Sequence, residues 1–260
     1  MESEKQFLLR HKQNGVLRLV IDRPKVNALN FQILAELKSA FHQAAQDESI
    51  RCVLISGAGE VFSAGHDVLD IANAQGESYR DHLQRTYNPL ILQMRSLPKP
   101  IIAAINGVVS GAALGIVLAC DLRVAANNAQ ITVGFTRLGL GLDSAVSLLL
   151  PAMIGLGRAT EYTFTNTPIN AADALVLGFV NRVVPPADLA DEAFHLAVNL
   201  AAGPVHAFGL CKEAFNRAVL RDLSEILDNE AQLQEIASRT MEHQEGVRAF
   251  LEKRPARFYA

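Results

Sequence analysis

The chain has 260 residues, half of them apolar and a fifth charged, so it can bury a sizeable core and is not expected to be disordered. Its formal net charge is −3 and no dense basic stretch occurs, which gives no support to nucleic-acid binding. The longest apolar run, residues 101–119, is interrupted by Asn106 and three glycines, so we expect no membrane span.

The three cysteines, Cys52, Cys120 and Cys211, are scattered in apolar surroundings and lack the spacing of metal ligands. We interpret them as reduced residues of the core. Residues 1–5 show neither the pattern of a signal peptide nor that of an Arg-rich presequence. These features together predict a cytoplasmic protein without a metal site.

Strands and helices alternate through the first half of the chain. Asn14-Gly15 is a strong two-residue turn signal and predicts a hairpin of residues 7–10 and 16–22. A helix is predicted over Phe31–Gln46, because apolar residues recur on one face and Asn30 can cap its start. The other elements expected here are strands at residues 52–56, 101–105 and 122–126 and a helix at residues 80–95. Such alternation predicts an α/β fold with a largely parallel sheet and right-handed crossovers.

Helices dominate beyond about Pro151. They are expected at residues 158–164, 171–177, 187–201, 205–220, 223–241 and 247–252. Alanine and leucine are frequent in them, and a helical end this apolar often packs on a neighbouring subunit. We therefore divide the chain into an α/β core, residues 1–200, and a helical C-terminal region, residues 201–260, that takes part in oligomerisation.

Residues 105–115 carry a run of small side chains between the strand at 101–105 and an apolar helix. Gly107 and Gly111 can take backbone angles closed to other residues, and small side chains leave the amide N–H groups of a helix start free. Such amides can bind an anion, or an oxygen that gains negative charge during a reaction. The alternative is a tight turn with close packing of helix on strand.

A second loop of small residues, 61–67, follows the strand at 52–56. The two loops in this order resemble the crotonase family, the enoyl-CoA hydratase/isomerase superfamily. The resemblance extends over almost the whole chain. It rests on several short motifs: Ile21-Asp22-Arg23-Pro24, Asn27-Ala28-Leu29-Asn30, Phe62-Ser63-Ala64-Gly65-His66-Asp67, residues 100–107, Ala119-Cys120-Asp121, residues 178–184 and residues 245–254.

The resemblance implies a crotonase-like spiral of ββα units, with a C-terminal trimerisation region and assembly as homotrimers or dimers of trimers. It also implies action on acyl-CoA thioesters, with coenzyme A as part of the substrate and no separate cofactor. The backbone N–H groups of His66 and Ala112 would then bind the thioester oxygen, forming an oxyanion hole. The ring of His66 is expected to pack beside coenzyme A rather than to act as a base.

The resemblance further implies two groups of substrate contacts. Those for coenzyme A are Lys25, Ala28, Ala64, Gly65, Asp67 and Lys253. Those for the acyl group are Leu69, Tyr87, Asn88 and Phe135. Lys25 and Lys253 have the alternative interpretation of solvated surface lysines, and we interpret Asp67 and Asp121 as structural.

Hydration of a 2-enoyl-CoA in this family generally uses two glutamates, and the positions that match them here are Gly115 and Phe135. Neither residue transfers a proton. Asp143 resembles in position the acid/base aspartate of several isomerases, including dienoyl-CoA isomerase, and the nucleophile of 4-chlorobenzoyl-CoA dehalogenase. A dehalogenase also needs a histidine where Asn88 stands. Outside this resemblance, Asp143 would be interpreted as the N-cap of a helix at residues 145–154.

We therefore predict a Δ3/Δ2-type enoyl-CoA isomerase in which Asp143 moves the proton. Its apolar neighbours Leu142 and Phe135 should raise its pKa, which suits a base that must also act as an acid. The alternatives are an enoyl-CoA hydratase with an atypical site, in which Asp143 holds the water, and a catalytically silent acyl-CoA-binding protein.

Overall fold

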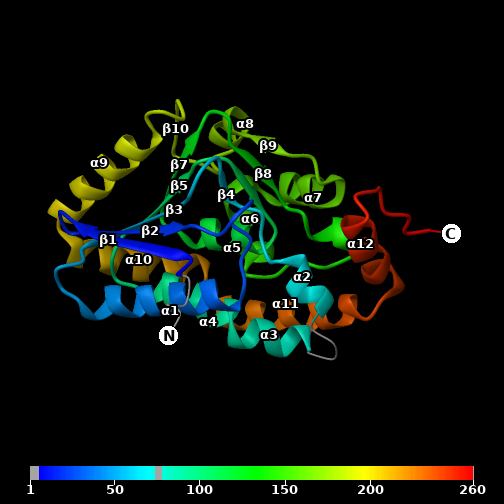
Figure 1. Cartoon of the computed structure of the whole chain (residues 1–260). Helices are drawn as coiled ribbons and strands as arrows, with labels where there is room; N and C mark the ends of the chain where they lie inside the picture. Colours follow the sequence, from blue (N-terminus) through cyan, green and yellow to red (C-terminus); the bar gives the residue numbers. More distant parts are fainter. Residues whose placement is uncertain (1–5, 74–77, 260) are drawn as a thin grey trace, which may run out of the picture.

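The computed structural model describes residues 6–73 and 78–259; the segment 1–5, from which we predicted no targeting signal, lies outside this range. Two sheets are surrounded by helices (Figure 1). The larger sheet begins with the antiparallel pair β1 (Leu8–Gln13) and β2 (Val16–Ile21), joined by Asn14 and Gly15, both with positive φ. The predicted hairpin is thus confirmed.

Parallel strands complete the larger sheet. They are β3 (Cys52–Gly57), β5 (Ile101–Ile105), β7 (Leu122–Ala126) and β10 (Arg182–Val184), in the order β1-β2-β3-β5-β7-β10. Successive side chains of a strand point to opposite faces. Cys52 and Leu54 therefore pack toward α9 (Leu189–Ala202), whereas Val53 and Ile55 enter the main core. Burial on both faces explains the continuous apolar runs of these strands.

A smaller sheet, in the order β4-β6-β8-β9, contains β4 (Val61–Ser63), β6 (Val108–Ser110), β8 (Gln130–Thr132) and β9 (Ile169–Asn170). Each of β4, β6 and β8 follows a strand of the larger sheet after a short turn, and helices follow each pair. The chain thus advances as repeated ββα units, which confirms the predicted spiral.

The remaining elements are helices. They are α1 (Phe31–Gln46), α2 (Val68–Asn73), α3 (Tyr79–Arg85), α4 (Tyr87–Ser96), α5 (Ala112–Ala119), the 3₁₀ helix η1 (Phe135–Leu138), α6 (Val146–Ile154), α7 (Leu156–Thr165), α8 (Ala171–Val176), α10 (Val205–Val219), α11 (Leu223–Ser238) and α12 (Met241–Leu251). Helix α5 is buried along its whole length. Helix α11 packs against α3, and α12 against η1 (Figure 1).

No single described helix is long and apolar enough to cross a membrane; α9 and α10 reach that composition only as a pair, bent by 102°.

Three predictions differ from the structure. The helix expected at residues 80–95 is two helices, because Thr86 leaves the helical path and its Oγ1 donates to the His82 carbonyl oxygen at 2.7 Å. The helix expected at 247–252 starts at Met241, where the Thr240 side chain accepts the amide N–H of His243. Cys211 is exposed rather than a core residue, since it lies on the outer face of α10.

Candidate active site

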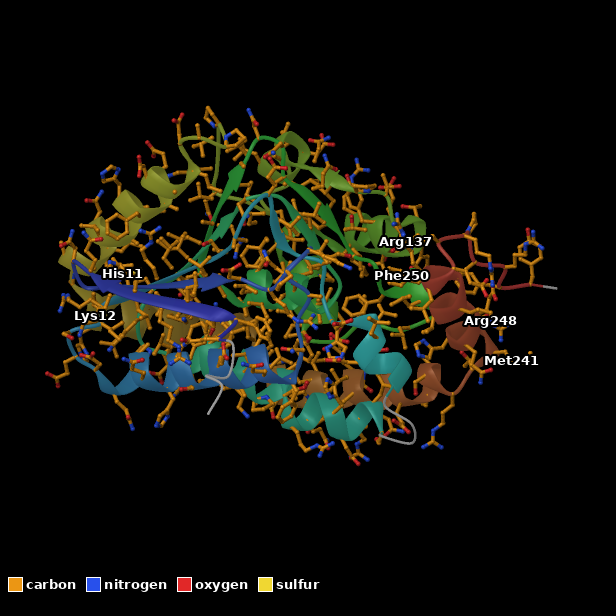
Figure 2. All side chains as sticks on the ribbon, viewed as in Figure 1. His11, Lys12, Arg137, Met241, Arg248 and Phe250 are labelled. Atoms are coloured by element: carbon orange, nitrogen blue, oxygen red, sulfur yellow. The ribbon has the colours of Figure 1, made fainter. Side chains whose placement is uncertain are left out.

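One cavity of about 1030 Å³ opens between the loops that follow β2, β4 and β6 and the C-terminal helix α12. Its wall is formed by the loops around residues 25–31 and 64–70, by the starts of α3 and α5, by η1, and by α12 with the segment that follows it. Arg137 of η1 and Phe250 of α12 both line the cavity and are labelled in Figure 2. The lining is mostly apolar, with polar groups at a few places, as expected of a small-molecule site.

Two loops of small residues meet at one wall of the cavity. Strands β4 and β6 are parallel neighbours with Ser63 opposite Val109, so the loops that follow them run side by side. Gly65 has φ +92°, and a Cβ there would lie 2.6 Å from the Ser110 carbonyl oxygen. A glycine is therefore required for the loops to approach this closely.

The amides of His66 and Ala112 both face the space between these loops. Leu29 donates its amide N–H to the Gly65 carbonyl oxygen and accepts that of Asp67, both at 2.8 Å, so the His66 amide points the other way. Ala112 is the first residue of α5, where an amide has no acceptor within its helix. Within residues 6–73 and 78–259, neither amide has a hydrogen-bond acceptor. The pair can donate to one oxygen.

The ring of His66 belongs to an aromatic group rather than to an acid/base pair. Its Nδ1 lies 3.0 Å from Tyr87 Oη, and its centroid lies 4.9 Å from that of His82. Burial lowers the pKa of His66 to about 3, and the nearby His82 adds to this effect. The ring is therefore neutral at physiological pH, and its backbone is the group presented to the cavity.

Asp143 is the buried carboxylate of the cavity wall. Its Oδ1 accepts a hydrogen bond from Ser144 Oγ at 2.7 Å, and its Oδ2 accepts one from Gln234 Nε2 at 2.9 Å. Burial raises its pKa to about 7, with the nearby Glu230 raising it further, whereas the two hydrogen bonds lower it. No described lysine, arginine or histidine forms an ion pair with it. Near neutral pH the group can accept a proton and return it.

The backbone beside Asp143 is unusual. Ser144 and Ala145 have φ +57° and +64°, so Ala145, not Asp143, stands at the N-cap position of α6. The N-cap interpretation of Asp143 is thus wrong. Gly115 of α5 makes room for this turn, because a Cβ there would lie 2.3 Å from Ser144 Cβ. Gly115, the position expected to match a hydratase glutamate, thus lets α5 pack closely against Ser144 and leaves no room for a side chain.

Sequence reasoning missed Glu230 and Gln234 of α11, which support this turn. Glu230 accepts the amides of Ala145 and Ser147 at 2.7 and 2.9 Å, and Gln234 binds Asp143. Both belong to the buried face of α11, with Leu227 and Ala231. The available signal was their place among apolar residues at helical spacing, because a polar side chain there must find a buried partner.

Most of the residues expected at coenzyme A lie on the wall of the cavity. Lys25, Ala28, Ala64 and Asp67 line it, and Gly65 forms the loop contact behind them. The Asp67 carboxylate is held by Arg23 at 2.7 Å, which agrees with a structural role. Lys253 does not line the cavity; among the described residues, the lysines and arginines that do are Lys25, Arg137 and Arg254.

Three of the four residues expected around the acyl group line the cavity. Leu69, Tyr87 and Phe135 line the cavity, but Asn88 does not, since its Nδ2 donates to the Leu227 carbonyl oxygen at 3.1 Å. Tyr79 also lines the cavity, and its Oη lies 3.2 Å from His243 Nε2.

No three His, Cys, Asp or Glu side chains of the described residues are grouped closely enough to hold a metal ion.

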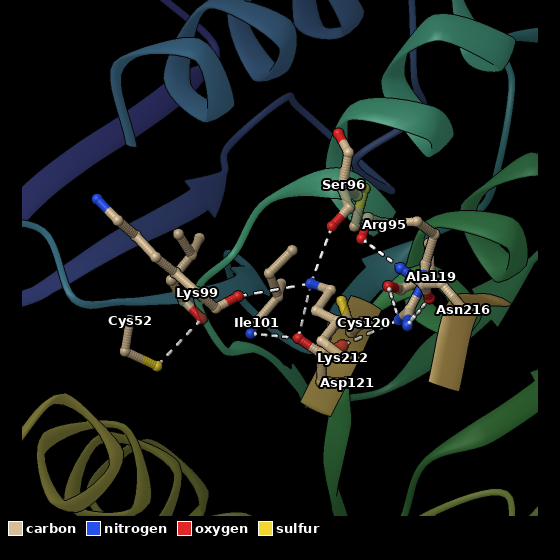
Figure 3. Close-up of polar contacts among 12 residues, drawn as sticks. Cys52, Arg95, Ser96, Lys99, Ile101, Ala119, Cys120, Asp121, Lys212 and Asn216 are labelled. Atoms are coloured by element: carbon tan, nitrogen blue, oxygen red, sulfur yellow. Dashed lines mark hydrogen bonds and ion pairs between the residues drawn. The ribbon is translucent and has the colours of Figure 1, made fainter. Parts of the chain in front are cut away.

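Asp121, by contrast, lies in a polar cluster away from this cavity (Figure 3). Its carboxylate accepts from Arg95 Nη1 and from Lys212 Nζ, each at 2.9 Å, and from the amide of Ile101 at 2.9 Å. This arrangement joins α4 and α10 to the start of β5, which supports the structural interpretation of Asp121.

Comparisons with known proteins agree with this geometry. The model of a family described as enoyl-CoA hydratase/isomerase matches residues 11–260. The chain is 37% identical over 257 residues to a 1,2-epoxyphenylacetyl-CoA isomerase of Escherichia coli, covering 97% of this chain and 98% of that protein. It is 36% identical over 245 residues to a probable enoyl-CoA hydratase of Rhodobacter capsulatus, covering 94% of each. The crystal structure of an enoyl-CoA hydratase from Mycobacterium avium subsp. paratuberculosis superposes with a TM-score of 0.88 at 30% identity, covering 98% and 99% of the two chains.

Proposed function

The chain belongs to the enoyl-CoA hydratase/isomerase family of acyl-CoA enzymes, and from this premise we propose that it is a Δ3/Δ2-type enoyl-CoA isomerase. The observation that carries the proposal is Asp143: a buried carboxylate without a cationic partner among the described residues, on the wall of the cavity that the free amides of His66 and Ala112 also line. A carboxyl group with a pKa of about 7 suits a residue that removes and returns a proton.

The chemistry follows from these three groups. The thioester oxygen of a 3-enoyl-CoA accepts hydrogen bonds from the amides of His66 and Ala112. The Asp143 carboxylate removes a proton from Cα, and the electron pair of that C–H bond moves toward the thioester oxygen to give a dienolate, which the two amides stabilise. Asp143 then delivers the proton to Cγ, and the electrons return to leave a double bond between Cα and Cβ. Atoms and charge balance without water.

Hydration would need a second group that activates water. The positions that match the hydratase glutamates hold Gly115, which faces Ser144, and Phe135. Isomerisation is therefore the reaction that the residues present support better.

We propose that Lys25 and Arg137 bind the phosphates of coenzyme A, because both are cationic and line the cavity.

The test is the conversion of a 3-enoyl-CoA to its conjugated 2-enoyl isomer, followed by the absorbance of the conjugated thioester. Asp143→Asn should lower kcat by roughly 10² to 10⁴-fold, the usual contribution of a positioned acid or base. Asp70→Asn is the matched control, because Asp70 also lines the cavity but is exposed, and it should stay within a few-fold of wild type. Full activity of Asp143→Asn would show that the assignment is wrong.

A hydratase with an atypical site is the second candidate, favoured by the similarity to the Rhodobacter capsulatus protein named as a probable enoyl-CoA hydratase. Asp143-dependent loss of the conjugated absorbance of a 2-enoyl-CoA would support it over the isomerase. Tight acyl-CoA binding without turnover of either substrate would instead support a silent binding protein.

We also propose that the chain assembles as a homotrimer or a dimer of trimers. Exposed apolar side chains on α10, among them Leu210, Phe215 and Val219, support self-association of the C-terminal region. Light scattering at micromolar concentration tests this, and a monomer would contradict it.

A further inference from the structure

Two side chains of α11 hold the turn that carries Asp143. Glu230 and Gln234 are 2% and 0% exposed. Residues four apart lie on the same face of a helix, so both point toward residues 143–147. Gln234 Nε2 donates to Asp143 Oδ2 at 2.9 Å, whereas Glu230 accepts the amides that follow Asp143. One helix face thus binds both the reactive side chain and the backbone next to it.

Glu230 fixes the backbone. The left-handed conformations of Ser144 and Ala145 cost free energy and persist only where the surroundings hold them. Ala145 has no side chain that could cap α6, and its own amide and that of Ser147 need acceptors. The two carboxylate oxygens of Glu230 supply both. The position of Asp143 relative to the cavity therefore depends on α11.

The side-chain amide of Gln234 has a hydrogen-bond partner for its nitrogen but none, among the described residues, for its oxygen. Its Nε2 binds Asp143, but its Oε1 is buried and has no hydrogen-bond partner among the described residues. A side-chain amide has nearly the same shape after a half turn, which exchanges its donor and its acceptor. Because nothing described holds Oε1, that half turn would break no hydrogen bond other than the one to Asp143.

We propose that Gln234 is a positioning residue for proton transfer, whose amide donates to Asp143 as a carboxylate and, after a half turn, accepts from Asp143 as a carboxylic acid. The inference rests on the proposed function, in which Asp143 alternates between these two states. It explains why a residue with one unsatisfied polar atom occupies a fully buried position. Ser144 Oγ, on the other oxygen of Asp143, is a hydroxyl that can likewise donate or accept.

The titratable groups coupled to Asp143 come from three elements. Glu230 on α11 raises the pKa of Asp143, and Asp143 adds to the effect of burial in raising the pKa of Tyr79 on α3 and of Tyr87 on α4. Removal of the Gln234 amide should raise the pKa of Asp143, because the hydrogen bond to the charged form is the stronger one. Removal of the Glu230 charge should lower that pKa, since a like charge nearby favours the protonated form. Substitutions of Gln234 and Glu230, on one face of α11, should thus shift the pKa of Asp143 in opposite directions. A general loss of packing would not produce this pattern.

The experiment is an infrared titration of the Asp143 carboxyl group in the free enzyme, its bands being those absent from Asp143→Asn. Gln234→Leu should raise the midpoint by roughly one pH unit, because a charge-assisted hydrogen bond is about twice as strong as a neutral one. It should also move the C=O band of protonated Asp143 to higher frequency, since the acid has lost its acceptor, and lower kcat with little change in KM. Glu230→Gln should lower the midpoint.

Gln232→Leu is the matched control, the same change at an exposed position of α11, and should leave the midpoint and kcat unchanged. Gln234→Met, with circular dichroism of each variant, shows whether an effect comes from the lost amide or from misfolding. A wild-type midpoint and band in folded Gln234→Leu would overturn the inference. This readout needs no turnover, so it is distinguishable from the failure of the proposed function, which an active Asp143→Asn would reveal.

Discussion

Asp121 and Asp143 both lie against helices of the C-terminal region, yet their surroundings differ in one respect. Asp121 faces two cations, Arg95 and Lys212, which are themselves largely buried (Figure 3). Asp143 faces a hydroxyl, an amide and a second carboxyl group. The first carboxylate is compensated by charge, whereas the second accepts hydrogen bonds, among the described residues, from neutral donors only.

The difference is the one expected between a structural carboxylate and the reactive carboxylate that we propose at Asp143. The two cations that bind the Asp121 carboxylate join it to the helices that carry them, α4 and α10. A buried carboxylate without a cation has a pKa near neutrality, and such groups occur at catalytic sites. The contrast can be tested by changing each residue in turn.

The largest expected effect is on stability at the Asp121 cluster. Asp121→Asn leaves Arg95 and Lys212 without their anion, and breaking such a pair costs roughly 3 to 5 kcal/mol of unfolding free energy. Urea unfolding at pH 7 measures it. The activity of the folded fraction should be unchanged, and loss of activity without loss of stability would break the comparison.

The next largest effect is expected on kcat when the Ala112 amide, which lies on the same cavity wall as Asp143, is removed. Ala112→Pro removes one amide donor at the first position of α5, where proline is tolerated. It should lower kcat by about 10² to 10³-fold, the usual contribution of one oxyanion-hole donor. Ala112→Gly retains the amide and is the control for steady-state kinetics. Equal activity of the two variants would exclude this amide as a donor.

Asp143→Asn should have the opposite effect on stability to Asp121→Asn. The pKa of Asp143 is raised on folding from 3.8 to about 7, so its contribution is most favourable below pH 4 and declines as pH rises to 7. Asparagine does not titrate. The variant should therefore gain roughly 2 kcal/mol relative to wild type between pH 5 and pH 7, because each full pH unit between the two pKa values contributes about 1.36 kcal/mol and the slope flattens as the pH approaches 7. Thermal or urea unfolding at both pH values measures the gain, and a constant difference would contradict the raised pKa.

The smallest effect is the pH dependence of the wild-type reaction. Because the proposed base is the ionised form of Asp143, kcat/KM for a 3-enoyl-CoA should fall about tenfold per pH unit below pH 7 and level off above it. Asp121→Asn should show the same profile. A profile that is flat from pH 5 to pH 8 would place the base elsewhere.

The parts of the molecule built from local patterns could be predicted from the sequence. The Asn14-Gly15 hairpin, the cap of Asn30 on α1 and the alternating strands follow from turn chemistry and periodicity. The small-residue loop at residues 105–115 follows from its own pattern between a strand and an apolar helix, and the resemblance to a family paired it with the loop at residues 61–67 and pointed to Asp143. The structure brings the amides of His66 and Ala112 onto one cavity wall, since that requires only a backbone path.

The parts that depend on packing between distant segments could not be predicted. Gln234 is 91 residues from Asp143 in the chain, and only the packing of α11 brings them together. Asn88 turns toward Leu227 for the same reason, although it was expected at the acyl group. Lys253 was expected at coenzyme A from a motif, but it does not line the cavity, whereas Arg137 of η1 does.

The most direct test of the account is the exchange of substrate protons with solvent. A 3-enoyl-CoA is incubated in D₂O with wild type and with Asp143→Asn, and deuterium at Cα and Cγ is followed by NMR. Because the proton held by Asp143 can exchange with solvent while the dienolate is bound, before it is returned to either carbon, the account predicts that wild type introduces deuterium at both carbons. Asp143→Asn, which still binds the thioester through the amides of His66 and Ala112, should introduce it at neither. Exchange at the wild-type rate in Asp143→Asn would contradict the claim that this carboxylate carries the proton.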